Sequence, residues 1–550
     1  MTGTFLLGER KTRPGAYYRR ERAGVTTEGA TNGILACIFQ SNWGVLNKEF
    51  DVDQTMLNEL EDYFGDGADI LREGLLGGAT TIRAIRVGGG DGECAKVTFK
   101  TLAEVTTTQN LEQEYTTTGT AAQEFDLPAN FADENVKIIS GGVDITDAVT
   151  IADDKIKISA DNFTNNQIVD NKFKLTWDKV TTSEEETAAV ELSAKYPGDR
   201  DFTASIRTNL LTDQRQLFIY DGTEVFLSVT FAAGDDEAQS LVDALANNRH
   251  FAARKIHTGE LLDITQAALT GGVNPTVTTA SYDKGTQILE RYTWNVIVAD
   301  TDEVAVKGIL TSFVSQSYQT GRLGMACIAG QSSEDLENRM AFAASINDEK
   351  VIYLLNGWVG NDGTVYDGWR GAARIGGMVA ASESNASLTH TVVSNALELI
   401  EPLTNGEITR GIQKGCLVLS LNSDDQIWID AAVNTLVTLG TDQDEGWKKI
   451  RRTKCRFELM DRINATHDKL VGKINNNTDG RATLVAAAMK IINEMIAENK
   501  LVFGSYVEED PGHPAEGDRC YFKLHILDLD SAEFIYNTFV FRFGQTFDEE

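Results

Sequence analysis

The chain has 550 residues and, at roughly 100 to 200 residues per domain, is expected to form about three to five compact units. Lys and Arg total 50 against 82 Asp and Glu, a formal net charge of -32. Proteins that neutralise phosphates carry the opposite excess, so nucleic acid and anionic membrane surfaces are excluded as partners. Hydrophobic residues make up 42% of the chain, which is ordinary for a folded globular protein.

Neither membrane insertion nor export is expected from the apolar segments. The longest apolar runs, such as residues 34–39, are far shorter than the roughly 18 to 20 residues that span a bilayer. The N-terminal run at residues 5–7 is too short for a signal peptide, so we expect synthesis in the cytoplasm without export. The six cysteines show no CxxC spacing, which favours reduced, packed thiols over disulfides or a metal site.

The first half of the chain changes character twice. Residues 1–24 form a polar leader with net charge +4, and Pro14 lies within it. Residues 25–95 mix short apolar runs with a period-2 strand pattern at 80–87, which predicts an α/β segment. Residues 96–185 are Thr-rich and show short β-type runs at 136–139 and 155–158, separated by Asp, Asn and Gly turns. We interpret this stretch as an inserted β-sandwich.

After Pro197 the pattern returns to alternating strands and helices, and beyond Pro275 a βαβ rhythm is typical of a buried and largely parallel sheet. The expected strands are 217–220, 294–299, 325–329 and 351–355, and the expected helices are 238–246, 303–313 and 334–345. Beyond Pro402 we expect a strand at 417–421 and helices at 451–470 and 483–499, followed by a β-rich end at 521–543.

No motif for catalysis, cofactor binding or metal binding stands out. A GxGxxA pattern lies within residues 88–95, but a strand pattern follows it where a dinucleotide site needs a helix. Ala486 stands where an EF-hand loop needs its bidentate Glu, so a helix-capping turn is favoured for the partial match at Asn475, Asn477, Asp479 and Gly480. The serine loop at residues 330–333 lacks the second glycine of a GxSxG motif, and the six histidines lack metal-ligand spacing. We therefore expect no enzyme, no cofactor and no metal.

Short motifs follow one another along the chain in a recognisable order. They are Arg13-Pro14-Gly15-Ala16-Tyr17, Ser41-Asn42-Trp43-Gly44, Gly77-Gly78-Ala79, Ser193-Ala194-Lys195-Tyr196-Pro197-Gly198, Ala373-Arg374-Ile375-Gly376-Gly377-Met378 with Ser387-Leu388-Thr389, Gly415-Cys416-Leu417-Val418, Val433-Asn434-Thr435-Leu436, Gly472-Lys473 and Asp479-Gly480-Arg481. In order and approximate spacing, this set resembles the contractile tail sheath family of bacteriophages and phage-tail-like bacteriocins, particularly the Gram-positive prophage form. After Pro197-Gly198 the chain reads Asp199-Arg200-Asp201 where the family usually has TRGN, so the turn at that point departs from the family's pattern.

The resemblance implies a fold class and a domain organisation. The expected fold is a multidomain α/β protein: a subtilisin-like α/β core without protease function, an inserted β-sandwich, a C-terminal α+β domain, and extended N- and C-terminal arms. The expected boundaries are an N-terminal linking arm at 1–24, the core at 25–95 with 186–400, the inserted sandwich at 96–185, a C-terminal sheath domain at 401–505 and a C-terminal β arm at 506–550.

The resemblance also implies a function. Members of the family are structural subunits that polymerise as helically stacked hexameric rings around an inner tail tube and contract to drive the tube through a target cell envelope. The implied partners are further copies of the chain, the inner tail tube protein, and the baseplate and tail-terminator proteins. The implied location is a virion tail or headless tail-like particle assembled in the bacterial cytoplasm. An extracellular surface-layer or adhesin-type structural protein, suggested by the Thr-rich segment, and a serine hydrolase, suggested by the core's fold analogy, stay open as alternatives.

Two groups of residues are implied to matter for assembly. The arms are expected to contact other copies through Phe5, Leu6, Leu7, Arg10, Arg13, Pro14, Tyr17, Phe534, Tyr536, Phe539, Phe541 and Phe543. Structural roles are expected for the motif residues Trp43, Pro197, Gly415, Asn434, Gly472, Lys473, Asp479 and Arg481. The basic leader and the acidic residues 501–550, with net charge -8, are expected to meet between copies.

Overall fold

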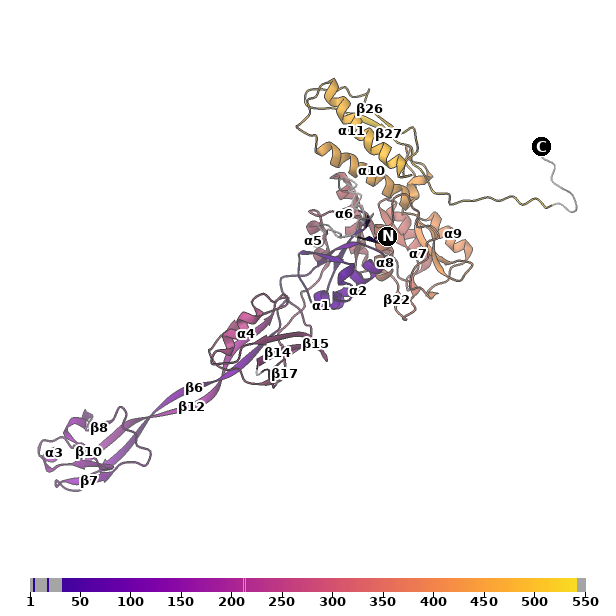
Figure 1. Cartoon of the computed structure of the whole chain (residues 1–550). Helices are drawn as coiled ribbons and strands as arrows, with labels where there is room; N and C mark the ends of the chain where they lie inside the picture. The colour runs from indigo at the N-terminus through magenta and orange to yellow at the C-terminus, as the bar shows by residue number, and fades with distance from the viewer. Residues whose placement is uncertain (1–2, 5–16, 19–31, 211, 213, 542–550) are drawn as a thin grey trace. The chain divides into compact units, whose positions relative to one another are not determined.

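The structure, a computed structural model, describes residues 3–4, 17–18, 32–210, 212 and 214–541. The described chain is a multidomain, mixed α/β protein with several separate sheets (Figure 1). It divides into two compact units. The first comprises residues 1–93, 196–199 and 273–550, and the second comprises residues 94–195 and 200–272.

An eight-stranded sheet forms the centre of the first unit. Its strands lie in the order β25 (Ile427–Ala431), β24 (Cys416–Leu421), β20 (Val351–Leu354), β19 (Met325–Ala329), β18 (Val296–Ala299), β3 (Ile34–Phe39), β5 (Thr81–Arg86) and β4 (Glu49–Asp53). All neighbours from β24 to β5 are parallel, and the edge strands β25 and β4 are antiparallel. The largely parallel sheet predicted for this part of the chain is confirmed.

Helices cover both faces of this sheet, and strand β3 shows why. All six of its residues are buried, and alternate side chains enter opposite apolar clusters because side chains on a strand alternate between faces. Leu35, Cys37 and Phe39 pack with α1 (Leu60–Phe64), α2 (Ala68–Leu76) and α8 (Trp369–Ala381). Their neighbours on the other face pack with α5 (Thr279–Leu289), α6 (Val304–Gln319), α7 (Leu336–Ile346) and α9 (Asn405–Gln413).

A helical pair follows the sheet in sequence. Helices α10 (Ile450–Asp468) and α11 (Thr478–Ala497) share an apolar cluster with the two-stranded antiparallel sheet of β26 (Tyr506–Glu509) and β27 (Phe522–His525). The Asn477 side chain accepts a hydrogen bond from the Gly480 amide at 2.8 Å and so caps α11. The turn favoured for this loop by the sequence is confirmed. A small sheet of β22 (Val365–Tyr366), β21 (Trp358–Val359) and β23 (Glu398–Leu399) completes the unit.

The second unit is organised by two very long strands. Strands β6 (Lys96–Thr116) and β12 (Lys172–Ala194) pair antiparallel from Thr116 opposite Lys172 to Lys96 opposite Ser193. Between them the chain forms β7 (Gln123–Asp126), β8 (Lys137–Ser140), β9 (Val143–Asp144), β10 (Thr150–Ala152), β11 (Lys155–Ile158) and α3 (Ala160–Thr164). Strands β8 and β9 extend the long ladder, while β10, β11 and β7 form a second sheet. Side chains from both sheets share one apolar cluster.

The second unit is larger than the expected insert of residues 96–185. Strand β16 (Phe251–Lys255) pairs with β12. The rest of the added segment forms a four-stranded sheet of β15 (Glu224–Phe231), β14 (Gln214–Asp221), β13 (Phe202–Asn209) and β17 (Ile264–Ala268), with helix α4 (Glu237–Leu245). Residues 200–272 thus lie in this unit because their strands and contacts are local to it.

Helices α2 and α8 approach each other closely because glycines face each other across the contact. A Cβ atom on Gly377 of α8 would lie 2.3 Å from the carbonyl oxygen of Gly74 in α2. A Cβ atom on Gly77 would lie 2.4 Å from the carbonyl oxygen of Arg374. Both obstacles are backbone atoms, so any larger residue forces the helices apart.

We predict that Gly377→Ala lowers the free energy of unfolding by about 1 to 3 kcal/mol, because the added methyl group overpacks this helix contact. Urea denaturation of the purified chain measures the change. The matched control is Gly308→Ala in α6, where a Cβ meets nothing within 4 Å, so that variant should be stabilised by up to about 1 kcal/mol. Equal effects of the two substitutions would contradict the close-packing explanation.

Candidate interaction surfaces

The chain beyond β27 presents an exposed apolar segment, residues 534–541, in which no helix or strand forms. Phe534 is 76% exposed, Tyr536 90% and Phe541 91%, and Ile535, Phe539 and Val540 are also exposed. A run of exposed aromatic and aliphatic side chains is typical of a surface that another molecule covers. Of the C-terminal arm residues expected to contact other copies, Phe534, Tyr536, Phe539 and Phe541 lie in this segment, while Phe543 lies outside the described residues.

The base of this segment is held to α10 by a group of ion pairs that we call the arm clamp. The Lys449 ammonium lies 2.8 Å from Asp530 and 3.0 Å from Glu533. The Asp528 carboxylate forms ion pairs with the guanidinium groups of Arg452, at 3.0 Å, and Arg456, at 3.4 Å. The clamp consists of Lys449, Arg451, Arg452 and Arg456 with Asp528, Asp530 and Glu533.

Hydrogen bonds reinforce the clamp. Arg451 donates to the Leu529 carbonyl oxygen, and Ser387 donates its hydroxyl to Glu533 at 2.8 Å. The side chains of Arg451 and Asp528 are almost fully buried, so these charges are screened less by salt than surface pairs. The residues just before the exposed segment are therefore fixed on the body, and the segment itself is free for contacts elsewhere.

The clamp shifts the pKa values of its own groups. Burial acts to raise the pKa of Asp530, but hydrogen bonds from Lys449 and the Ser531 amide outweigh it and hold that pKa below its ordinary value. Burial acts to lower the pKa of Lys449, but hydrogen bonds to Asp530 and Glu533 hold it above its ordinary value. The clamp is therefore fully formed between the ordinary pKa values of the two groups. It weakens as the pH falls through the lowered pKa of Asp530 or rises through the raised pKa of Lys449.

Sequence reasoning did not identify the clamp. One half of its signal was visible, because residues 448–456 read Lys-Lys-Ile-Arg-Arg-Thr-Lys-Cys-Arg and hold six cations within nine positions. The acidic partners at 528–533 lie more than 70 residues further along. The tertiary structure brings the two segments together, with β27 packed against α10 and α11 just before the acidic residues.

The N-terminal arm residues fall almost entirely outside the described part of the chain. Two short strands, β1 (Gly3–Thr4) and β2 (Tyr17–Tyr18), pair in parallel. Of the expected contact residues, only Tyr17 is placed, as part of β2. The others lie outside the described residues, and their roles stay predictions: Phe5, Leu6, Leu7, Arg10, Arg13 and Pro14.

The two early motifs that contain Trp43 and Pro197 meet at one buried arginine. The fully buried Arg86 donates to the carbonyl oxygens of Ser41 at 2.9 Å, Gly44 at 2.7 Å and Pro197 at 2.8 Å. The Trp43 ring packs edge-on against Tyr196, with ring centroids 5.2 Å apart. A Cβ on Gly198 would lie 1.8 Å from the Asn42 carbonyl oxygen, so only glycine fits where these two backbone segments touch. These motif residues join two distant segments within the first unit.

Gly415 and Asn434 make a second joint of this kind. Gly415 has φ +79° and its Cβ would lie 2.8 Å from the Cα of Thr435, so the backbones touch there. The fully buried Asn434 donates to the Trp447 carbonyl oxygen at 2.8 Å and accepts from the Leu436 amide at 3.1 Å. These contacts fix the loop between β25 and α10.

The remaining motif residues lie at the turn between α10 and α11. Gly472 has φ +73° in this turn, and the Lys473 ammonium donates to the Lys469 carbonyl oxygen at 2.6 Å. Arg481 donates to Glu509 of β26 at 2.7 Å. Asp479 lies in the first turn of α11, where its charge is favourable to the helix dipole. The structure therefore gives this group local structural contacts at one end of the helical pair.

The candidate chemistry in the sequence has structural explanations. In the serine loop at residues 330–333, the Ser332 hydroxyl and amide both donate to the Asp367 carboxylate, at 3.0 and 2.9 Å. Among the described residues, no three His, Cys, Asp or Glu side chains are grouped to hold a metal ion. Within the same residues, no helix is long and apolar enough to span a membrane.

Comparison with known proteins identifies similar folds. Residues 276–435 match the family described as the phage tail sheath protein central domain. A sheath tail protein from Desulfitobacterium hafniense is 16% identical with a TM-score of 0.60, over 93% of this chain and 100% of that one. A sheath tail protein from Listeria innocua is 15% identical with a TM-score of 0.56, over 92% of this chain and 97% of that one. No curated protein matches the sequence.

We predict that the triple variant Asp528→Asn/Asp530→Asn/Glu533→Gln speeds amide hydrogen exchange in residues 526–533 by about tenfold or more, since charge-assisted hydrogen bonds contribute roughly 1.5 to 3 kcal/mol each. Exchange is measured by mass spectrometry on the unassembled chain. The control is Asp518→Asn, an exposed acid outside the clamp, which should leave the exchange unchanged. Equal protection of residues 526–533 in both variants would show that the ion pairs do not hold the base of the arm.

Proposed function

This chain belongs, through residues 276–435, to the phage tail sheath family, and we propose that it is the structural subunit of a contractile tail sheath. In this proposal it polymerises as helically stacked six-subunit rings around an inner tail tube and contracts to drive the tube through the target cell envelope. One observation carries the proposal: ion pairs hold residues 528–533 on α10, while the apolar C-terminal segment at residues 534–541 directly after them is exposed. The similarity to two sheath tail folds over more than 90% of the chain supports it.

A segment of this kind is suited to joining copies by strand addition. An extended segment that pairs with an exposed sheet edge gains backbone hydrogen bonds whatever its side chains. At about 1 kcal/mol net for each bond, four to six bonds contribute about 4 to 6 kcal/mol before ordering costs. Among the described residues, β26 and β27 pair only with each other, so this two-stranded sheet offers open edges to a strand from another copy.

Repetition of one such contact is enough to build a cylinder. A contact between two different surfaces of identical chains generates a ring if the rotation closes and a helix if it does not. Contraction is then a change between two packings of the same bodies, with the arms maintaining connection as the bodies move. The clamp supports this arrangement because it restricts freedom of movement to the residues beyond Glu533.

The remaining parts of the proposal follow the family. Residues 1–24 serve as an N-terminal linking arm whose positive charge meets the acidic C-terminal region of another copy. The sheet-centred first unit is the subtilisin-like core with the C-terminal sheath domain and has no protease function, and the second unit contains the inserted β-sandwich as an outward decoration. The partners are other copies, the inner tail tube protein, and baseplate and tail-terminator proteins, in a virion tail or tail-like particle.

A surface-layer or adhesin-type structural protein remains the alternative function. The exposed, Thr-rich ladder of β6 and β12 is the observation that favours it. Negative-stain electron microscopy of the purified protein separates the two functions. Hollow striated cylinders support a sheath, whereas flat lattices or dispersed single molecules under all assembly conditions contradict it.

We predict that Phe539→Asp/Phe541→Asp abolishes cylinders, because two charges in the apolar segment oppose its burial against another copy. The variant should remain folded, since both side chains are exposed. Electron microscopy gives the assembly state, and circular dichroism checks the fold.

The matched control for this prediction is Leu210→Asp. Leu210 is 96% exposed in the second unit and gains one carboxylate in place of an exposed apolar side chain, where the double variant gains two. Cylinders from the control combined with none from the double variant are the expected result. Normal cylinders from the double variant would exclude the C-terminal segment as a link between copies.

We also predict that assembly survives removal of the outer part of the second unit. Thr106 and Thr182 lie opposite each other in the antiparallel ladder, so residues 107–181 can be replaced by an Asn-Gly turn without changing the register below it. Electron microscopy should show cylinders of reduced diameter. Loss of cylinders from a folded variant would show that the removed segment makes contacts between copies.

A further inference from the structure

The ladder of β6 and β12 in the second unit is exposed on both faces along part of its length. Residues 102–108 of β6 lie opposite residues 180–186 of β12, and we call these two segments the ribbon. All ribbon residues of β12 are exposed, and none of the ribbon residues of β6 is buried. A strand that packs on a core buries every second side chain, and neither ribbon strand does so. No described element therefore covers either face of the ribbon.

Both ends of the same ladder pack on cores. On one side of the ribbon, Phe173 and Trp177 of β12 enter the apolar cluster of residues 111–177, which we call the outer lobe. On the other side, Val190 and Leu192 of β12 are buried, and β16 pairs with β12 there. The ribbon thus joins the outer lobe to the rest of the second unit, which we call the inner part.

The ribbon has only two strands. Strand β8 pairs with β12 at residues 174–176 and β16 pairs with it at residues 190–194, one on each side of the ribbon along the strand. Among the described residues, the two ribbon segments pair only with each other. An isolated pair of strands is marginally stable at best in water, because it has no hydrophobic face to bury. The ribbon is therefore maintained by the packed ladder at its two ends.

Side chains across the ribbon add little to its stability. Glu184 lies directly opposite Glu104, and like charges in that position oppose strand pairing. Glu186 pairs with Lys100 at 2.9 Å, but both side chains are more than half exposed. Exposed ion pairs contribute little to stability. The ladder is thus weakest within the ribbon, at the pair of glutamates.

A β-bulge lies where the packed ladder ends and the ribbon begins. Between Ala188 and Val190, β12 contains an extra residue, Ala189, that is not matched in β6. Its carbonyl oxygen accepts hydrogen bonds from the amides of Ile256 and His257, at 2.7 and 3.1 Å. A bulge bends and twists its strand locally. The strand is therefore fixed to the inner part at this residue and changes direction close to the ribbon.

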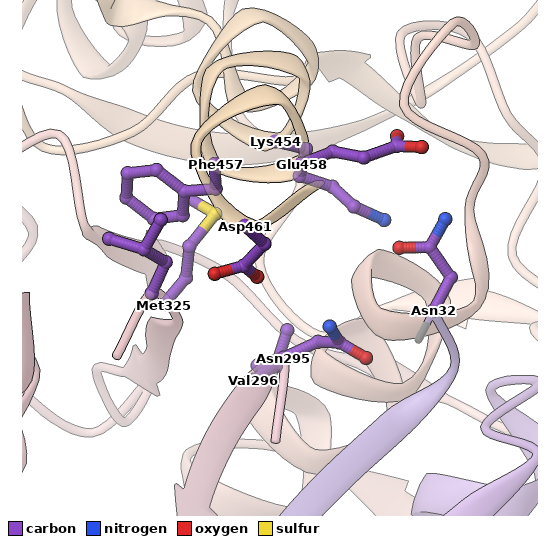
Figure 2. A pocket seen from close by; sticks show the side chains of 9 residues that line it. Asn32, Asn295, Val296, Met325, Lys454, Phe457, Glu458 and Asp461 are labelled. Carbon is purple, nitrogen blue, oxygen red and sulfur yellow. The ribbon is translucent and has the colours of Figure 1, made fainter. Parts of the chain in front are cut away.

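A junction in the first unit provides a contrast. Where α10 packs against the central sheet, Asn295, Lys454 and Asp461 surround a pocket of about 30 Å³, space for one or two water molecules (Figure 2). Lys454 donates to the carbonyl oxygens of Val379 and Ser382 at the end of α8. Movement at that junction would separate enclosed polar groups from their partners. The side chains of the ribbon face solvent instead, so bending there exposes no buried group.

We propose that the ribbon is a hinge on which the outer lobe turns relative to the inner part, while both keep their internal structure. Turning requires no loss of apolar packing, because the apolar clusters lie at the two ends of the ladder and not in the ribbon. Two-stranded ribbons also twist more strongly than larger sheets, so the backbone of this segment can bend without breaking the strands at either end.

The hinge has a consequence for assembly. Contraction changes the packing of neighbouring bodies, so a rigidly held lobe would meet different neighbours in the two packings. A lobe on a hinge adjusts its position in each packing while its body follows the sheath. This consequence rests on the proposed sheath function. The hinge itself is a property of the single chain, and it is measured on the unassembled chain whether or not the chain forms cylinders.

Amide hydrogen exchange within β6 tests the weakness of the ribbon. Residues 102–108 and 111–116 belong to one strand and both pair with β12, but only the second group lies in the outer lobe. After correction for intrinsic rates, the hydrogen-bonded amides of residues 102–108 should exchange at least about tenfold faster than those of residues 111–116. Mass spectrometry of the unassembled chain gives both rates. Equal rates would show that the ladder opens as one unit and would overturn the proposal.

Glu184→Thr tests the like charges, and Glu185→Thr is its matched control. Both substitutions replace an exposed ribbon glutamate by the same strand-forming residue, but Glu185 lies opposite Ala103. At low salt Glu184→Thr should slow exchange of residues 102–108 about two- to fivefold more than the control, because only this variant removes a like-charged cross-strand pair. Equal effects would contradict the placement of the weakest pairing at Glu104.

Distances between spin labels test the movement itself. One pair joins the outer lobe to the inner part through Ala160→Cys and Arg254→Cys, and the control pair, Ala160→Cys and Thr150→Cys, lies within the lobe; these positions are exposed. The half-exposed Cys94 and Cys520 are replaced by Ser, since the other cysteines are buried. Electron paramagnetic resonance should give a distance distribution at least about twice as wide for the first pair as for the control. Equally narrow distributions would overturn the proposal.

Discussion

The arrangement of the first unit depends on how the charges of one helix, α10, are neutralised. Its first turns carry the cations of the arm clamp, and its middle carries Lys454, Glu458 and Arg462, all nearly buried. Burying charges is costly unless they are paired and hydrogen-bonded. Their partners come from α8, from the end of α11 and from residues 528–533. Four segments that are distant in sequence are therefore positioned by one set of charges.

The short motifs of the chain have a common physical role in the structure. Arg86 binds three carbonyl oxygens from two segments, and Gly198, Gly377 and Gly415 each lie where a Cβ would strike another backbone. Such positions accept few alternatives, because a polar group left unpaired or an added methyl group has nowhere to relax. They maintain a rigid body, whereas the exposed segment at 534–541 makes no contact of this type among the described residues.

Rigid body and free segment differ in the forces that they use. The body relies on close packing around two apolar clusters, which tolerates little displacement. The clamp relies on charge, and the free segment on apolar exposure and unpaired backbone groups.

Local patterns in the sequence determined the parallel sheet, its covering helices and the cap of α11, because alternation of apolar residues and capping side chains act within a few positions. The exposed aromatic run at 534–541 was visible for the same reason. Tertiary structure alone decided that residues 200–272 join the second unit, through pairing of β16 with β12. It also decided that the cations at 449–456 meet the acids at 528–533. The physical reason is that strand pairing, ion pairing and burial join residues that are far apart in the chain. A local sequence pattern does not indicate which distant residues come into contact.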